Sequence, residues 1–204
     1  MTATFGLRSL ILLQLLALLL AGSCQSVPAV EALSYQDQFG RDHRPLEPPD
    51  GRAHVLVFVT TDCPIANGYA AEVQAIAAKF AEREVEFFLV HVDPTITRDA
   101  AEAHAQEFGY SAPSPEAQVR RILDPAHELV RATGVELTPE SVVLTHSGSL
   151  AYRGRIDDRY PALGHKRANV TERDLLTALE SVLAGQPVSR PRTRAVGCLI
   201  TVRE

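Results

Sequence analysis

The sequence predicts an α/β fold with a single domain, in which helices flank a central mixed β-sheet. Two β-branched and aromatic runs, at residues 54–60 and 85–92, have the composition of strands that are buried on both faces. Apolar residues recur at helical spacing between these runs, so the three segments make a right-handed βαβ unit. Residues 141–145 and 150–155 flank a His-Ser-Gly-Ser turn and are expected to pair as antiparallel neighbours.

The composition agrees with this interpretation. The chain has 204 residues, of which 46% are hydrophobic and 22% are charged, and these values are typical of a globular protein. They do not fit a disordered, collagen-like or multi-span membrane protein. The net charge of -5 does not indicate a nucleic-acid partner. The three cysteines cannot all pair within one chain.

Residues 1–23 have the outline of a secretory signal peptide. Arg8 precedes an apolar run from Leu10 to Ala21, which is shorter than the ~20 residues that a membrane-spanning helix needs. A removed export signal is therefore favoured over a retained anchor. Cys24 stands where a bacterial lipoprotein carries its lipidated cysteine, although Ala21 replaces the usual Leu. Lipidation of Cys24 and ordinary cleavage nearby both stay open, and either outcome places the protein in the periplasm or on a membrane, in an oxidising compartment.

The mature chain is expected to have three parts. Residues 24–32 form a tether, residues 33–184 form the domain, and residues 185–204 form a C-terminal tail that carries Cys198. The domain begins with an irregular hairpin that turns at Asp37–Gly40.

The remaining elements follow from local signals. We expect a helix over Asp99–Phe108 that ends at Gly109, a short strand at Val119–Leu123 and a short helix from Pro125 that ends at Gly134. A last helix is expected to be capped by Thr171 and to stop at Gly185.

Cys63 is the first candidate for chemistry. It follows a buried strand directly and precedes Pro64, which suits the first turn of a helix. A sulfur at a helix N-terminus is favoured as the thiolate, the nucleophile for disulfide exchange and peroxide attack. Asp62 argues the other way, because a neighbouring negative charge raises a thiol pKa. The structural alternative is a small buried apolar cysteine.

Thr138 and Pro139 precede the first strand of the hairpin at 141–155. Only about 5–6% of X-Pro bonds are cis, and a proline at the start of a strand also has an ordinary structural explanation. This dipeptide alone is a weak signal.

Three motifs together resemble the thioredoxin-like superfamily, more narrowly the secreted redoxins related to alkyl hydroperoxide reductase and thiol-specific antioxidant proteins. They are Thr61-Asp-Cys-Pro64, His91-Val-Asp-Pro94 and Thr138-Pro-Glu140. The resemblance covers about Ala32 to Ala184 and implies a thioredoxin-like fold with Cys63 as the nucleophile. It also implies that Pro139 is the cis-proline of the loop facing the thiolate. Two tail segments, residues 152–158 and 195–198, resemble a bacterial subgroup of redoxins without an assigned activity.

The sequence lacks part of the motif that is typical of each of the two activities in this superfamily. Ala66 stands where a thioredoxin-type CxxC motif needs its second cysteine. Thr60 matches the threonine that peroxiredoxins carry three positions before the reactive cysteine, but Leu56 replaces their proline. Because Pro139 is present and the peroxiredoxin proline is absent, disulfide exchange is favoured and peroxide reduction is the alternative.

Cys198 is the only other cysteine of the mature domain. A single nucleophilic thiol in an oxidising compartment needs a resolving partner. We therefore hypothesise that the tail folds back and brings Cys198 to Cys63, with a thiol or disulfide protein, or a peroxide, as the reaction partner. The alternative is a purely structural Cys63–Cys198 bridge, because closing so long a loop stabilises a fold by about 4–5 kcal/mol in the chain-entropy model.

Two further hypotheses concern neighbouring polar residues. No cofactor is required, but His91 could join Cys63 and Cys198 as a soft ligand set for Cu(I), as in copper-delivery members of the superfamily. Asn67 breaks the CxxxC motif of those proteins. The six other histidines have no ligand spacing.

Arg153, Arg155, Asp157 and Asp158 form a charge cluster at the end of the hairpin. This cluster is interpreted either as a solvated sheet edge or as the source of an arginine that reaches toward the thiolate.

Overall fold

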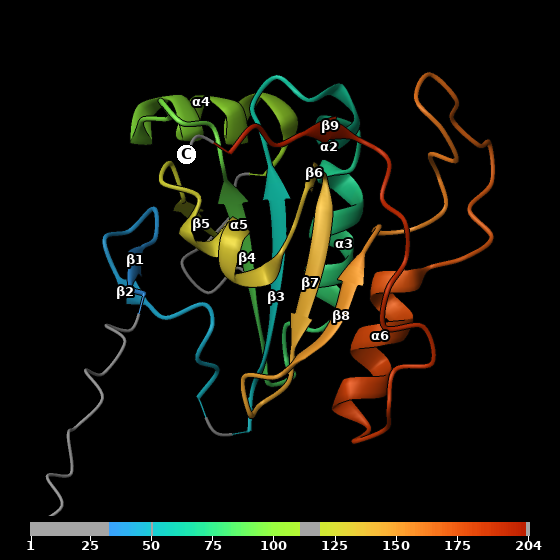
Figure 1. Ribbon diagram of the computed structural model, residues 1–204. Helices are drawn as coiled ribbons and strands as arrows, with labels where there is room; N and C mark the ends of the chain where they lie inside the picture. The colour runs from blue at the N-terminus through green and yellow to red at the C-terminus, as the bar shows by residue number, and fades with distance from the viewer. Residues whose placement is uncertain (1–32, 50, 111–118, 203–204) are drawn as a thin grey trace, which may run out of the picture. The chain divides into compact units, whose positions relative to one another are not determined.

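The computed structural model describes residues 33–49, 51–110 and 119–202. Within these residues five strands form one mixed sheet in the order β5-β4-β3-β7-β8 (Figure 1). They are β3 (Ala53–Val59), β4 (Val85–His91), β5 (Val119–Leu123), β7 (Glu140–Leu144) and β8 (Leu150–Gly154). The pairs β3–β4 and β4–β5 are parallel, whereas β3–β7 and β7–β8 are antiparallel. The mixed α/β sheet predicted from the sequence is confirmed.

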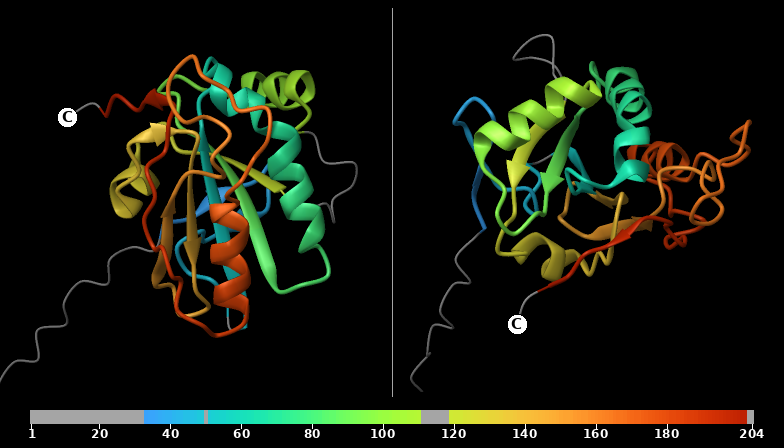
Figure 2. Two further views of the ribbon diagram at one scale, coloured as in Figure 1. Left: turned by 90° about the vertical axis from the view of Figure 1, so that its right-hand side faces the viewer. Right: turned by 90° about the horizontal axis from the view of Figure 1, so that it is seen from above.

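Helices cover both faces of the sheet. They are α2 (Pro64–Gly68), α3 (Ala70–Lys79), α4 (Arg98–Phe108), α5 (Glu128–Thr133) and α6 (Asp174–Leu183). Helices α3, α4 and α6 lie on one face and α5 lies on the other (Figure 2). Side chains of a strand alternate between the two faces, so Val55 and Val57 join the core under α3 and α6, while Leu56 and Phe58 join the core under α5.

Two short strand pairs stand outside the main sheet. One is the N-terminal hairpin of β1 (Tyr35–Gln36) and β2 (Asp42–His43). The other joins β6 (Leu137–Thr138) to β9 (Cys198–Leu199) of the C-terminal tail. From the end of α6 the tail runs back alongside β8 before it reaches β9 (Figure 1). It is therefore integrated into the fold rather than hanging from it.

Three expectations about helix boundaries were wrong. The helical pattern after Cys63 divides into α2 and α3, because Tyr69 ends the first helix with its N–H bonded to Ala66. Helix α5 begins at Glu128, three residues after Pro125. Thr171 does not cap α6, whose N-cap is Arg173. The Thr171 hydroxyl donates to the carboxylate of Asp158 instead.

The predicted signal segment, Cys24 and the tether lie outside the described residues. In the part of the chain that the structure covers, no helix has both the length and the apolar character needed to cross a membrane.

Candidate active site

Cys63 lies in the turn that joins β3 to α2 and is the N-cap residue of α2. The segment can turn here because Pro64 occupies the first helical turn, where its missing N–H is not needed. The Cys63 carbonyl accepts the first helical bond, from the N–H of Asn67 at 3.0 Å. The backbone thus holds the sulfur at the carboxyl end of the central strand, where the sequence placed it.

Two side chains hold the turn before Cys63. Asp93 accepts hydrogen bonds from the Thr61 N–H and from the Thr61 hydroxyl, at 3.2 Å each. The side-chain amide of Asn67 donates to the Thr61 carbonyl at 3.1 Å. Hydrogen bonds therefore connect the motif at residues 61–64 to the motif at residues 91–94.

The loop at Thr138 and Pro139 faces Cys63, and the peptide bond between them is cis. The Cys63 thiol donates a hydrogen bond to the Thr138 carbonyl, with 3.0 Å between sulfur and oxygen. The Thr138 hydroxyl lies 3.2 Å from that of Thr60. The structure thus brings three of the predicted site residues together, and Thr60 bonds to the loop through its hydroxyl.

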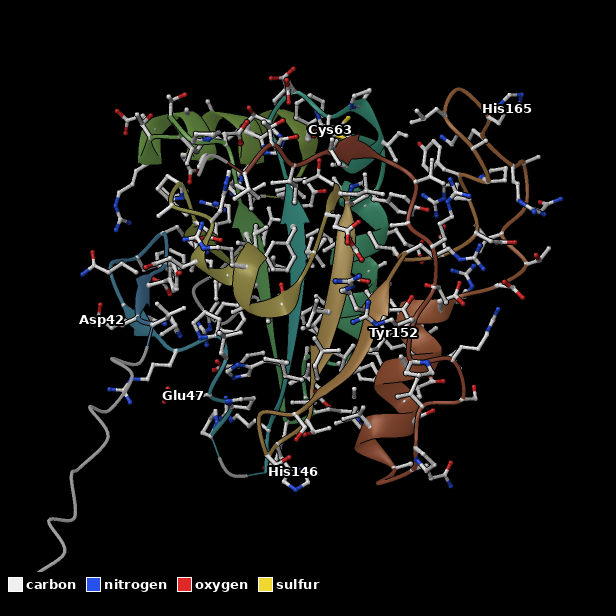
Figure 3. All side chains as sticks on the ribbon, in the orientation of Figure 1. Asp42, Glu47, Cys63, His146, Tyr152 and His165 are labelled. Carbon is white, nitrogen blue, oxygen red and sulfur yellow. The ribbon has the colours of Figure 1, made fainter. Side chains whose placement is uncertain are left out.

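The tail carries Cys198 to the same place. Strand β9 pairs antiparallel with β6, and Cys198 lies directly opposite Thr138. The side chain of Cys198 packs against the core cluster that contains Cys63. Figure 3 shows Cys63 next to the tail strand, at the end of the sheet where β3 ends. The chain places its two described cysteines together, both as free thiols.

Gly197 makes this pairing sterically possible. A Cβ at this position would come within 2.0 Å of the Thr138 carbonyl oxygen and 2.6 Å of its carbon. Backbone atoms cannot yield as a flexible side chain can. The tail therefore approaches the loop at a distance that only glycine permits.

The electrostatic surroundings make the two sulfurs unequal. Cys63 is fully buried, at 0% exposed, while Cys198 is partly exposed. Burial raises the pKa of the Cys198 thiol to about 12, with further contributions from the hydrogen bond and charge of Cys63 and from the charge of Asp62. Because thiolates repel one another, the pair resists ionising at both sulfurs.

A comparison with protein-family models agrees with this fold and site geometry. The family model described as Redoxin matches residues 26–170, which is more than half of the chain. The chain belongs to the Redoxin family. The match ends before α6 and the tail, so Cys198 lies outside the matched part of this redoxin.

Two solved structures have a similar fold over most of their length. A hypothetical protein from Sinorhizobium meliloti is similar with 22% identity and a TM-score of 0.67, over 82% of this chain and 89% of that one. An uncharacterised conserved protein from Geobacillus kaustophilus has 23% identity and a TM-score of 0.68, over 84% and 90%. A secreted disulfide oxidoreductase from Mycobacterium tuberculosis, homologous to DsbE of E. coli, aligns with 16% identity and a TM-score of 0.48, over 76% and 96%. No curated protein matches the sequence.

His91 does not join the two cysteines in this redoxin. Its Nε2 lies 3.1 Å from Nδ1 of His104, and Nε2 of His104 lies 2.8 Å from Oδ1 of Asn67. Among the residues that the structure describes, no group of three or more His, Cys, Asp or Glu side chains could hold a metal ion. The expected Cys63, Cys198 and His91 ligand set for Cu(I) is therefore not assembled in the described residues.

Both interpretations of the charge cluster were wrong. The arginines do not reach toward the thiolate, because carboxylates hold them: Arg153 lies 3.3 Å from Glu140 and Arg155 lies 2.7 Å from Asp174. Asp157 and Asp158 are buried, so the cluster is not a solvated edge. It joins the end of the hairpin to α6.

Sequence reasoning missed two features of the site. The buried His91–His104 pair was not predicted, since His104 has no fixed spacing from His91 and the two meet only through packing of α4. The role of Gly197 was missed although a signal was present. An isolated glycine next to extended, β-branched sequence is one sign that the backbone approaches another group closely.

Proposed function

We propose that this redoxin is a thiol–disulfide oxidoreductase that cycles between the Cys63–Cys198 dithiol and the corresponding disulfide. One observation supports this most strongly: Cys198 lies opposite Thr138, whose carbonyl accepts the Cys63 thiol. A buried thiol and a partly exposed thiol in contact are the parts that reversible disulfide formation needs.

The proposed reaction has two exchange steps. The Cys63 thiolate attacks one sulfur of a substrate disulfide, the substrate S–S bond breaks, and one substrate thiolate leaves. The Cys198 thiolate then attacks the Cys63 sulfur of the mixed disulfide and releases the second substrate thiol. The substrate disulfide is reduced to two thiols, and the cysteine pair is oxidised to a disulfide. Since Cys63 is buried in the described conformation, a large substrate requires β9 to move.

Peroxide reduction by the same pair is the alternative, in which the Cys63 thiolate would become a sulfenic acid before Cys198 resolves it. The absence of the peroxiredoxin proline at Leu56 disfavours it. The carboxylates that hold Arg153 and Arg155 disfavour it further, because neither guanidinium is directed to the thiolate. A non-enzymatic role with a permanent bridge is the other rival.

The reduction potential of the purified mature chain separates these possibilities. Mild oxidation should yield a peptide that links Cys63 to Cys198, and a dithiol buffer should open it at a potential above about -300 mV. A lower potential would indicate a structural bridge. Cys63→Ser and Cys198→Ser are the matched variants, and both should lose turnover of an aryl disulfide. Faster consumption of hydrogen peroxide than of disulfide would favour the peroxidase.

We also propose that the mature protein acts outside the cytoplasm, which the signal-like segment at residues 1–23 supports. Disulfide chemistry of this kind suits an oxidising compartment. The mass of the protein purified from membrane and soluble fractions tests this. A chain that begins at Cys24 with a bound lipid, or one cleaved close by, agrees with export, whereas an unprocessed N-terminus contradicts it.

A further inference from the structure

The two sulfurs of the pair differ in how an outside thiol can reach them. Cys63 is 0% exposed and belongs to the core cluster under α3 and α6. The Thr138 carbonyl and strand β9 close the remaining side. Cys198 is partly exposed, and of its two chain neighbours Gly197 has no side chain and Leu199 is 73% exposed.

Because of the geometry of disulfide exchange, this difference in access favours attack on one of the two sulfurs. An attacking thiolate approaches in line with the S–S bond, from the side opposite the sulfur that leaves, so access to the attacked sulfur sets the rate. Attack on Cys63 would have to pass through the packed core, because Cys63 is fully buried. Attack on Cys198 would come from the outer side of the tail.

An open groove lies along the tail segment that precedes Cys198. It has a volume of about 710 Å³ and is bounded by Leu137 of β6, by Leu163 of the loop before α6, and by Arg194 and Gly197 of the tail. Leu163 is 65% exposed. Gly197, the residue that precedes Cys198, is part of the lining, so a thiol carried on a small molecule or on a chain can lie in the groove next to Cys198.

The chemistry of the leaving group points the same way. Attack on Cys63 would expel Cys198 as a thiolate. Burial and the negative charge of Asp62 raise the pKa of the Cys198 thiol and so disfavour that thiolate. A thiol with a high pKa leaves slowly.

We infer that a dithiol reductant opens the Cys63–Cys198 disulfide by attack on the sulfur of Cys198, so that the mixed disulfide forms on Cys198 and Cys63 is released. The inference rests on the proposed function, since it concerns the disulfide of that cycle. The reductant thiolate forms a new S–S bond to Cys198. The old bond breaks, and its electron pair goes to Cys63, which takes a proton from solvent. The second thiol of the reductant then attacks its own sulfur in the mixed disulfide and frees Cys198. The reductant ends as a disulfide and the pair ends as two thiols.

Trapping of the first intermediate tests this. The oxidised mature chain is treated briefly with glutathione, which lacks a second thiol, and the freed cysteine is blocked with a maleimide. Peptide mass spectrometry should find glutathione on Cys198 and maleimide on Cys63, in at least about tenfold excess over the reverse pattern. Equal amounts, or glutathione mainly on Cys63, would overturn the inference and leave the proposed function standing. A chain that never forms the disulfide would overturn both.

Two variants test the structural cause. Gly197→Ala adds a Cβ at 2.0 Å from the Thr138 carbonyl oxygen, so it should displace β9 and expose Cys63. The ratio of glutathione on Cys198 to glutathione on Cys63 should then fall toward one. Leu199→Ala, on the other side of Cys198, is the matched control, because it removes an exposed side chain and adds no contact, and the ratio should stay as in the wild type. An unchanged ratio in Gly197→Ala, with β9 shown to be displaced by faster alkylation of Cys63, would contradict the inference. If Gly197→Ala does not fold, the wild-type ratio decides alone.

Discussion

Gly197 lies against the peptide of Thr138 so closely that a Cβ on the glycine would be 2.0 Å from the carbonyl oxygen. The same carbonyl accepts the Cys63 thiol at 3.0 Å. One backbone group thus touches the tail on one side and the buried cysteine on the other. The distance between the two cysteines of this redoxin therefore depends on how the tail lies on this loop.

Replacement of Gly197 by alanine should weaken disulfide formation. The added methyl group meets backbone atoms and forces β9 away from β6, at a cost of about 1–3 kcal/mol in stability. The yield of the Cys63–Cys198 disulfide after mild oxidation should fall, measured by the mass of the linked peptide. Gly68→Ala is the control, because its Cβ would meet only the movable hydroxyl end of Tyr160. A normal disulfide yield in Gly197→Ala would contradict the steric argument.

The disulfide itself should stabilise the fold. It closes a long loop, and the chain-entropy model assigns about 4–5 kcal/mol to such a closure as an upper value. Urea unfolding of the oxidised wild type should therefore have a higher midpoint than unfolding of the reduced protein. Cys198→Ser should unfold at the same urea concentration under both conditions. If the oxidised and reduced wild-type proteins unfold together, the two cysteines are not bonded.

The buried histidine pair predicts how stability depends on pH. Burial, with repulsion from His104 and Arg121, lowers the pKa of His91 to about 3, so His91 stays neutral in the folded protein. In the unfolded chain the imidazole titrates near 6.5 and binds a proton below that pH. The unfolded state therefore binds more protons, and the free energy of unfolding should fall as the pH is lowered from about 6.5 toward 3.

Urea unfolding at a series of pH values measures this slope. His91→Leu should show a smaller loss of stability between pH 6.5 and pH 4 than the wild type, in proportion to the proton that it no longer binds. His146→Gln is the control, because His146 is exposed in the hairpin loop, and its slope should match the wild type. A wild-type slope in His91→Leu would mean that other groups cause the acid sensitivity.

Asp158 predicts a structural effect far from the cysteines. Its buried carboxylate accepts the Thr171 hydroxyl and the N–H groups of Thr171 and Glu172, the latter two at 2.8 and 3.1 Å. The hydroxyl bond first, and then the two N–H bonds, lower the pKa of Asp158. Asp158→Ala leaves these donors unpaired, which should cost about 1–3 kcal/mol in the free energy of unfolding. Asp42→Ala, at an exposed position of β2, should change it by less than about 0.5 kcal/mol. Equal effects of the two variants would contradict the assignment.

Local patterns predicted most elements because their signals are local. A run of buried residues predicted β3, and Gly109 ends α4 with φ 79°, as expected of a left-handed C-cap. Thr171 shows the limit of this reasoning. Its sequence context is that of a helix cap, but the carboxylate of Asp158 lies within reach in the fold and takes both of its donors. A rule based on neighbouring residues does not include acceptors from distant parts of the chain that compete for the same donor.

The sequence by itself determined the class of fold, the place of Cys63 after a buried strand and the existence of one further cysteine in the tail. These follow from side-chain periodicity and from turn residues, which act over a few positions of the chain. Only the tertiary structure decided that Cys198 lies opposite Thr138, that His91 binds His104 and that Arg155 binds Asp174. Such contacts join residues far apart in the sequence, and each is chosen by close packing and by the nearest available hydrogen-bond partner, which no local pattern specifies.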